Sequence, residues 1–134
     1  MIAEVASSGD AITTADGSSM AVLVRGCDPV MAQRAGLMLP PLLGGAQLVS
    51  ATDDDSFFQL LDSRKFDAVL FAPGACRFSA AKQTIPGGNA ATRHWTLEEY
   101  RAKVLETQGA EVPIVETVEE RLIVPLTRKA LGLD

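Results

Sequence analysis

The residues best suited to bind a ligand lie in one stretch of the chain that carries no acidic side chain. Residues 68–97 contain no aspartate or glutamate, yet they include Arg77, Lys82 and Arg93. The formal net charge of the whole chain is −5, so this stretch reverses the local sign. Guanidinium groups bind phosphate and carboxylate through paired hydrogen bonds, and the pattern therefore predicts an anion-binding loop or lid over residues 75–95. The alternative is that these cations pair with surface carboxylates of the chain itself.

Glycines stand in the middle of the same stretch, at Gly87-Gly88-Asn89. Glycine lets the backbone approach a ligand closely, which suits an anion-binding loop. The triplet matches neither the G-x-x-x-x-G-K-[ST] phosphate loop nor the G-x-G-x-x-G dinucleotide motif. No cofactor is assigned from it.

Two cysteines and the single histidine are the residues that could carry covalent or acid–base chemistry. A thiolate at Cys76, favoured by Arg77 and a helix N-terminus, would be a nucleophile, with Cys27 as its resolving thiol. Lys82 stands where the C-x5-R pattern of a phosphatase loop needs arginine. His94 would serve as a general acid or base in a closing lid. The alternatives are an inert apolar cysteine at a strand end and a loop histidine held by its aromatic neighbour, so enzyme activity stays open.

Acidic residues cluster at 53–55 and at 116–120, and neither cluster predicts a metal site. Asp53, Asp54 and Asp55 follow Thr52 at the start of a predicted helix, where carboxylates cap the helix and interact with its dipole. Cysteines and histidine at ligand spacing are lacking, so there is no zinc motif. Glu116, at the end of a predicted strand, is the acidic residue expected to supply a carboxylate to a ligand site.

Alternating strands and helices must position these residues. Apolar runs rich in β-branched residues predict the strands, and capping residues predict where the helices begin. Thr96 with Glu99 forms one predicted capping box, and Thr117 with Glu120 a second. The predicted strands cover residues 21–25, 47–50, 67–72 and 112–116, and the predicted helices cover 29–39, 52–65, 96–108 and 118–131.

This alternation is typical of the α/β class and predicts a small three-layer α/β/α sandwich with a mostly parallel sheet. Four strands in the order 2-1-3-4 would give a flavodoxin-like, Rossmann-like architecture. Ligands of such sheets lie beyond the carboxyl ends of the strands where the winding reverses, here between the first and third strands. The predicted ligand-binding residues are Arg25, Gly26, Cys27, Asp28, Gly74, Arg77 and Arg93.

The conformation of the two terminal segments, residues 1–19 and 118–131, is less clearly indicated by the sequence. Residues 1–19 are rich in serine, threonine, alanine and glycine, which predicts a flexible leader before a single domain at 20–134. At the other end, residues 118–131 keep a helical apolar spacing, but Pro125 would kink a helix. The favoured interpretation is a kinked helix, and the alternative is a fifth, edge strand over residues 122–126.

Composition narrows the partners and the location. An acidic protein offers no sequence-independent affinity for nucleic acid or anionic lipid, so neither partner is expected. The absence of an apolar run of membrane-spanning length, of an N-terminal presequence and of a disulfide pattern favours a cytoplasmic protein. The mean hydropathy of +0.15 favours coverage by a second subunit, so a homo-oligomer, in the simplest case a homodimer, is an open prediction. The apolar stretch over residues 31–43 is interpreted as core, with an oligomer contact as the alternative.

Two known families share part of this pattern. Residues 67–81, DAVLFAPGACRFSAA, resemble the third-strand segment of type II dehydroquinases, whose catalytic tyrosine loop has no counterpart here because Tyr100 falls in a predicted helix. The layout is also similar to that of response-regulator receivers. Ala72 or Pro73 stands where their phospho-accepting aspartate would be. We therefore assign the chain to neither family.

Three functions remain as expectations. The leading one is a small cytoplasmic flavodoxin-like domain that binds a small anionic ligand, bearing phosphate or carboxylate, under the 75–95 loop. The second is a non-catalytic protein-interaction or structural module, in which the loop or the Met/Leu-rich helix contacts a partner. The third is a small enzyme that uses Cys76 or His94.

Overall fold

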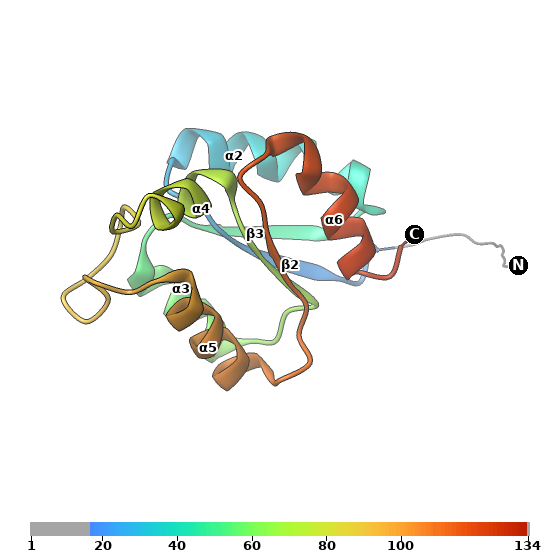
Figure 1. Ribbon diagram of the computed structural model, residues 1–134. Helices are drawn as coiled ribbons and strands as arrows, with labels where there is room; N and C mark the ends of the chain where they lie inside the picture. The colour runs from blue at the N-terminus through green and yellow to red at the C-terminus, as the bar shows by residue number, and fades with distance from the viewer. Residues whose placement is uncertain (1–16, 134) are drawn as a thin grey trace, which may run out of the picture.

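The computed structural model describes residues 17–133, in which strands and helices alternate along the chain (Figure 1). The strands are β2 (Ala21–Arg25), β3 (Gln47–Ala51), β4 (Ala68–Phe71) and β5 (Ile114–Glu116). The α-helices are α2 (Pro29–Met38), α3 (Asp54–Ser63), α4 (Pro73–Ala80), α5 (Leu97–Gln108) and α6 (Ile123–Ala130). Two short 3-10 helices, η1 (Pro40–Leu43) and η2 (Glu120–Leu122), precede β3 and α6.

The four strands form one parallel sheet in the order β3-β2-β4-β5. This confirms the predicted order 2-1-3-4 and the α/β, flavodoxin-like class. β2 and β4 lie side by side, with Arg25 opposite Phe71 at their carboxyl ends. The two central strands, β2 and β4, are buried along their whole length, as their continuous apolar sequences predict for strands covered on both faces.

Helices cover both faces of the sheet (Figure 1). Side chains of α3 and α5 pack with alternate residues of β2 and β4, represented by Leu23 and Val69. The other face carries Val22 and Leu70 and is covered by α6, η1 and the end of α2. Because successive strand residues point to opposite faces, Arg25 shares the α3/α5 face with Leu23. The topology therefore aims this guanidinium into the core.

Side chains cap the α-helices at three positions. The Asp28 carboxylate accepts hydrogen bonds from the first-turn amides of α2, and Pro29 is the first helical residue. Asp53 caps α3 by accepting from Ser56 N at 2.8 Å. Thr96 and Glu99 form the predicted capping box of α5, which ends at Gly109. These caps satisfy amides that have no partner inside the helix.

The 75–95 segment is not one loop, and this corrects the prediction. Its first part belongs to α4, which begins at Pro73 and continues to Ala80. Pro73 ends the strand but suits the first turn of a helix, where no amide donor is needed. The connection that remains runs over residues 81–96, and it reaches α5 with no further regular helix or strand.

The C-terminal segment is helical, and no strand forms between residues 118 and 131. The edge-strand alternative is therefore wrong, and the predicted single helix over 118–131 is instead η2 followed by the shorter α6. Pro125 is the third residue of α6, where a missing amide costs no intrahelical hydrogen bond. The second capping box is also wrong, because the Thr117 hydroxyl accepts from Glu119 N and the chain first forms η2.

The predicted leader, residues 1–19, lies mostly outside the described residues. Its last part is described, and Gly17 N donates to Gly44 O at 2.8 Å, beside the end of η1. Within residues 17–133 no helix combines the length and the apolar character needed to cross a membrane.

Candidate functional site

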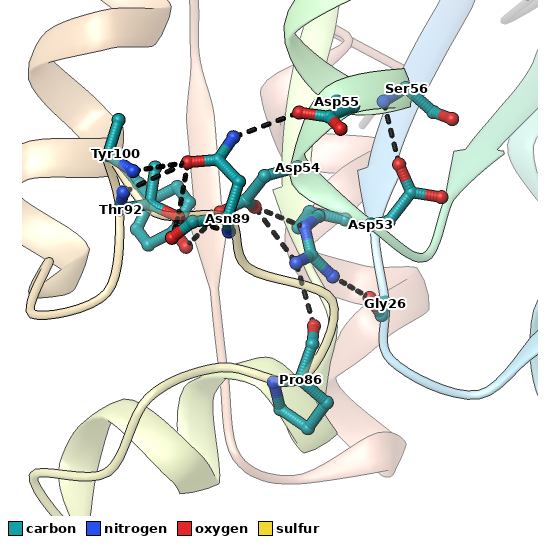
Figure 2. A network of polar contacts seen from close by, with 11 residues as sticks. Gly26, Asp53, Asp54, Asp55, Ser56, Pro86, Asn89, Thr92 and Tyr100 are labelled. Carbon is teal, nitrogen blue, oxygen red and sulfur yellow. Dashed lines mark hydrogen bonds and ion pairs between the residues drawn. The ribbon is translucent and has the colours of Figure 1, made fainter.

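Arg25, at the carboxyl end of β2, is the centre of a buried polar network. Figure 2 labels its partners Gly26, Asp54 and Pro86. The Nε and Nη2 atoms of Arg25 donate to Asp54 Oδ1 at 3.0 and 2.9 Å, and neither side chain is exposed to solvent. Nη2 also donates to Pro86 O at 2.8 Å, and Nη1 donates to Gly26 O. The second oxygen of Asp54 accepts from the Tyr100 hydroxyl at 2.7 Å. The network therefore joins β2, α3, α5 and the 81–96 connection.

Burial explains why every charge in this network is matched. A buried charge left alone is strongly unfavourable, whereas a paired and hydrogen-bonded one is tolerated. Asp54 is the first residue of α3, so its carboxylate also lies at the positive end of the helix dipole. Burial and the Asp54 carboxylate both raise the pKa of Tyr100, which keeps its hydroxyl protonated as a donor.

The 81–96 connection is fixed onto this network. Asp54 N donates to Gly87 O at 2.8 Å, and Asn89 Nδ2 donates to Asp55 Oδ1 at 2.9 Å. Gly87 has φ +86°, and a Cβ there would stand 2.3 Å from Thr52 O, so this close approach requires glycine. At the end of the connection the Trp95 ring lies edge-on to Tyr100, with 5.2 Å between centroids. These contacts hold the 81–96 connection against the start of α3 and against Tyr100 of α5.

The three predicted anion-binding arginines occupy different environments. Arg25 is buried, and its guanidinium donates hydrogen bonds to Asp54 and to Pro86 O. Arg77 and Arg93 are exposed, Arg77 Nη2 donating to Val118 O at 2.8 Å. His94 is exposed in the same connection as Arg93. An anion arriving from solvent therefore meets Arg77 and Arg93, whereas Arg25 would first have to leave Asp54.

The crevice between β2 and β4 is narrow where the sequence predicted a ligand. A Cβ added to Gly74 would lie 2.8 Å from Cys27 Sγ, so the half-buried thiol already packs against this glycine. Gly26 is buried and approaches Ala72, while Asp28 serves as the α2 cap. Of the predicted residues, Cys27 and Gly74 pack against each other at this edge, whereas Arg77 and Arg93 are exposed.

Cys76 has the environment of a structural thiol. It is buried in the first turns of α4, and its Sγ donates to Phe71 O at 3.3 Å. Burial raises the pKa of the thiol to about 11, with a further rise from the nearby Glu116 carboxylate. Both Cys27 and Cys76 are free thiols. A reactive cysteine needs the opposite shift, so these features disfavour the nucleophile hypothesis.

A hollow of about 610 Å³ opens at the carboxyl ends of β4 and β5, between α4 and α5. Its floor holds Glu116, which lies 2.7 Å from Arg101 Nε in a half-buried ion pair. Sequence analysis singled out Glu116 but not Arg101, because the two residues meet only through the packing of α5 against β5. Glu98 also lines the hollow, so the hollow carries charges of both signs and does not favour an anion.

Helices α2 and η1 expose a group of large apolar side chains to solvent, which is unusual for a protein surface that binds no partner. Five large apolar side chains there are between 45% and 76% exposed: Val30, Met31, Leu37, Met38 and Leu42. The interpretation of residues 31–43 as core is therefore wrong for most of them. Leu43 does enter the core, and Leu39 is half-buried. We call the five exposed side chains the α2–η1 face.

The membership of Asp54 and Tyr100 in this network was not predicted from the sequence. Asp54 was assigned a helix-dipole role together with its neighbours, and Tyr100 a place in a helix. Their partners are distant in the chain, Asp54 lying 29 residues from Arg25 and 46 from Tyr100. No local pattern reports such a pairing.

The fold places this chain in the class of small α/β proteins with flavodoxin-like strand order. In residues 17–133 no cluster of three or more histidine, cysteine or acidic side chains is arranged to hold a metal ion. No protein-family model, curated protein or solved structure matches the chain.

Proposed function

We propose that this protein is a non-catalytic interaction module that binds a macromolecular partner through the α2–η1 face. One observation carries the proposal. Of the seven large apolar side chains exposed in residues 17–133, five lie on this face, and the other two are Leu105 and Val118. Apolar side chains gathered on one surface mark an interaction site, whereas scattered ones need no explanation.

Helix geometry makes the α2–η1 face continuous. Val30 and Leu37 are seven residues apart, as are Met31 and Met38, which places all four on one side of α2. The opposite side contributes half-buried small residues and Leu39 toward the sheet, and α2 buries no residue completely. The helix thus presents its large apolar side chains outward and its small ones inward, which is the reverse of an ordinary surface helix.

Both cysteines are free thiols, which fits the proposed cytoplasmic location. The face would be covered there by the partner for most of the protein's lifetime, because exposed apolar surface of this kind promotes aggregation.

A small anionic ligand is the second candidate. It is favoured by the exposed Arg77 and Arg93 in a stretch without acidic residues, next to the carboxyl edge of the sheet. In this proposal the two exposed guanidinium groups hold the anion while Arg25 stays paired with Asp54. An enzyme based on Cys76 is the least supported function, since burial keeps its thiol protonated.

The experiment for the interaction module is Leu37→Glu/Met38→Glu in the full chain, with Leu105→Glu as the matched control. Leu105 is also exposed but lies on α5, on the opposite side of the sheet. We expect the double variant to keep its melting temperature and to lose association with its partner, measured by chemical cross-linking in cells. The control should keep both. Association that survives the double substitution would show that the α2–η1 face is not the interface.

A further inference from the structure

We infer that the partner of the α2–η1 face is an amphipathic helix carrying a carboxylate that pairs with Arg34. The inference rests on the proposed function and names the chemistry of its partner. It is drawn from the position of Arg34, from the charges around the face and from the shape of the exposed helix.

Arg34 stands in the middle of the apolar stripe. It is three or four residues from each of Val30, Met31, Leu37 and Met38, the spacings that bring side chains together on a helix. The side chain is exposed, and no ion pair or hydrogen bond joins it to any other described residue. A partner that covered the stripe with apolar groups alone would bury this charge without compensation. A matching partner therefore supplies a carboxylate at the centre of the interface.

Further cations lie beside the face. The last turn of α6 carries Arg128 and Lys129, and Arg128 Nη1 donates to Leu42 O at 3.0 Å, which ties this turn to the α2–η1 face. α2 itself has no acidic residue in its first turn. Asp28 precedes it, and its carboxylate is engaged by the amides of Val30 and Met31. Arg34, Arg128 and Lys129 therefore place cations at and beside the face.

These charges disfavour a second copy of the chain as the occupant. Two-fold symmetry pairs the same surface with itself, so a dimer whose axis passes through the centre of the face would bring Arg34 of one copy close to Arg34 of the other. Like charges in an interface are repulsive, whereas an acidic partner is attracted and oriented by the same groups.

The occupant is best matched by a helix because four of the five side chains of the face lie on one side of α2. Two helices pack by placing side-chain ridges of one into grooves of the other, and such a partner offers its own stripe at the same spacing. α2 and α6 lie on the same side of the sheet (Figure 1), so the incoming helix would contact α2 and η1 with its acidic edge near the end of α6.

The test uses model peptides of about 18 residues, roughly five helical turns, with a hydrocarbon staple that holds them helical. One has leucines at i, i+3, i+4 and i+7 with glutamates elsewhere, and its counterpart replaces each glutamate with lysine. Fluorescence anisotropy against the full chain should show that the glutamate peptide binds about tenfold more tightly or better, as one matched charge pair predicts. Arg34→Glu should reverse the preference, and Arg34→Lys should largely preserve it. Gln33→Glu, an exposed site outside the stripe, is the control for charge alone.

Equal binding of the two peptides, or a preference for lysine, would overturn the inference. Failure of the glutamate peptide to bind would overturn it too. In that case sedimentation separates the two proposals: concentration-dependent self-association that Leu37→Glu abolishes makes a second copy the occupant and leaves the interaction module standing. If Leu37→Glu affects neither peptide binding nor any association, both proposals fall.

Discussion

Arg25 and Asp54 form an ion pair in which both side chains are completely buried, at the point where β2 ends and α3 begins. The Tyr100 hydroxyl and Pro86 O complete it, so one polar cluster holds a strand, two helices and the 81–96 connection together. This polar cluster lies at the carboxyl edge of the sheet, where ligands of such folds bind. The hydrogen bonds of Arg25 and Asp54 are nevertheless made to other residues of the protein.

Removing one member of this pair should destabilise the protein strongly. Asp54→Ala leaves a buried guanidinium without its counter-ion, and the free energy of unfolding should fall by about 3–5 kcal/mol. Denaturant titration followed by circular dichroism measures the change. Arg101→Met is the matched control, because its ion pair with Glu116 is partly exposed and should be worth less than about 1 kcal/mol. Equal effects at the two sites would contradict the structural role given to Asp54.

Replacing both partners should cost less than the two single changes together. Arg25→Met/Asp54→Leu removes both charges together, so no buried charge is left unpaired, and the remaining cost comes from the Gly26 and Pro86 carbonyls and the Tyr100 hydroxyl that lose a partner. A double-mutant cycle in the same denaturant assay gives the coupling energy directly. Strictly additive effects would indicate that the pair does not interact.

Two glycine-to-alanine changes should act in opposite directions. Gly87 has a positive φ and no room for a Cβ, so Gly87→Ala should destabilise by more than about 1 kcal/mol and loosen the 81–96 connection. Gly36 lies inside α2 with no heavy atom near an added Cβ, so Gly36→Ala should stabilise by about 0.5–1 kcal/mol. Thermal unfolding compares them, and amide hydrogen exchange reports the connection. A neutral Gly87→Ala would show that the connection is held less closely than its contacts imply.

The Cys76 thiol should make stability fall at alkaline pH. In the unfolded chain a cysteine ionises near its ordinary pKa of 9.0, whereas burial raises the pKa of Cys76 to about 11. Between pH 9.0 and about 11 the Cys76 thiol is ionised in the unfolded chain and protonated in the folded protein. The free energy of unfolding therefore decreases as the pH rises through this range. Cys76→Ala should flatten this part of the profile.

Alkylation gives a second reading of the same thiol. In a Cys27→Ser background, iodoacetamide should modify Cys76 more slowly at pH 8 than it modifies a free thiol such as glutathione. The reciprocal Cys76→Ala protein reports the half-buried Cys27. Modification of Cys76 faster than the free thiol would restore the nucleophile hypothesis.

The anion-binding candidate predicts a phosphate-dependent gain in melting temperature. Phosphate compared with chloride at equal ionic strength should stabilise the natural protein, and Arg77→Ala/Arg93→Ala should remove the gain without unfolding it. Arg34→Ala/Arg64→Ala makes the same change in net charge at two other exposed arginines and should keep the gain. Stabilisation that persists in Arg77→Ala/Arg93→Ala would exclude this site.

Local sequence determined most of the architecture of this protein. Continuous apolar runs specified β2 and β4, and Asp28, Asp53 and the Thr96–Glu99 pair placed the helix starts. These features act over a few neighbouring residues, which is why periodicity and capping preferences reveal them. Alternation of the elements then led to the strand order, because parallel strands need helical crossovers of fixed hand.

Tertiary structure alone decided what the polar and apolar side chains do. Arg25 looked like a ligand for an anion until packing placed Asp54 against it, and residues 31–43 looked like core until α2 turned Leu37 and Met38 outward. Burial and charge pairing arise between segments far apart in the chain. A sequence read along its length shows which residues are able to pair or pack, and the assembled layers determine which of them do.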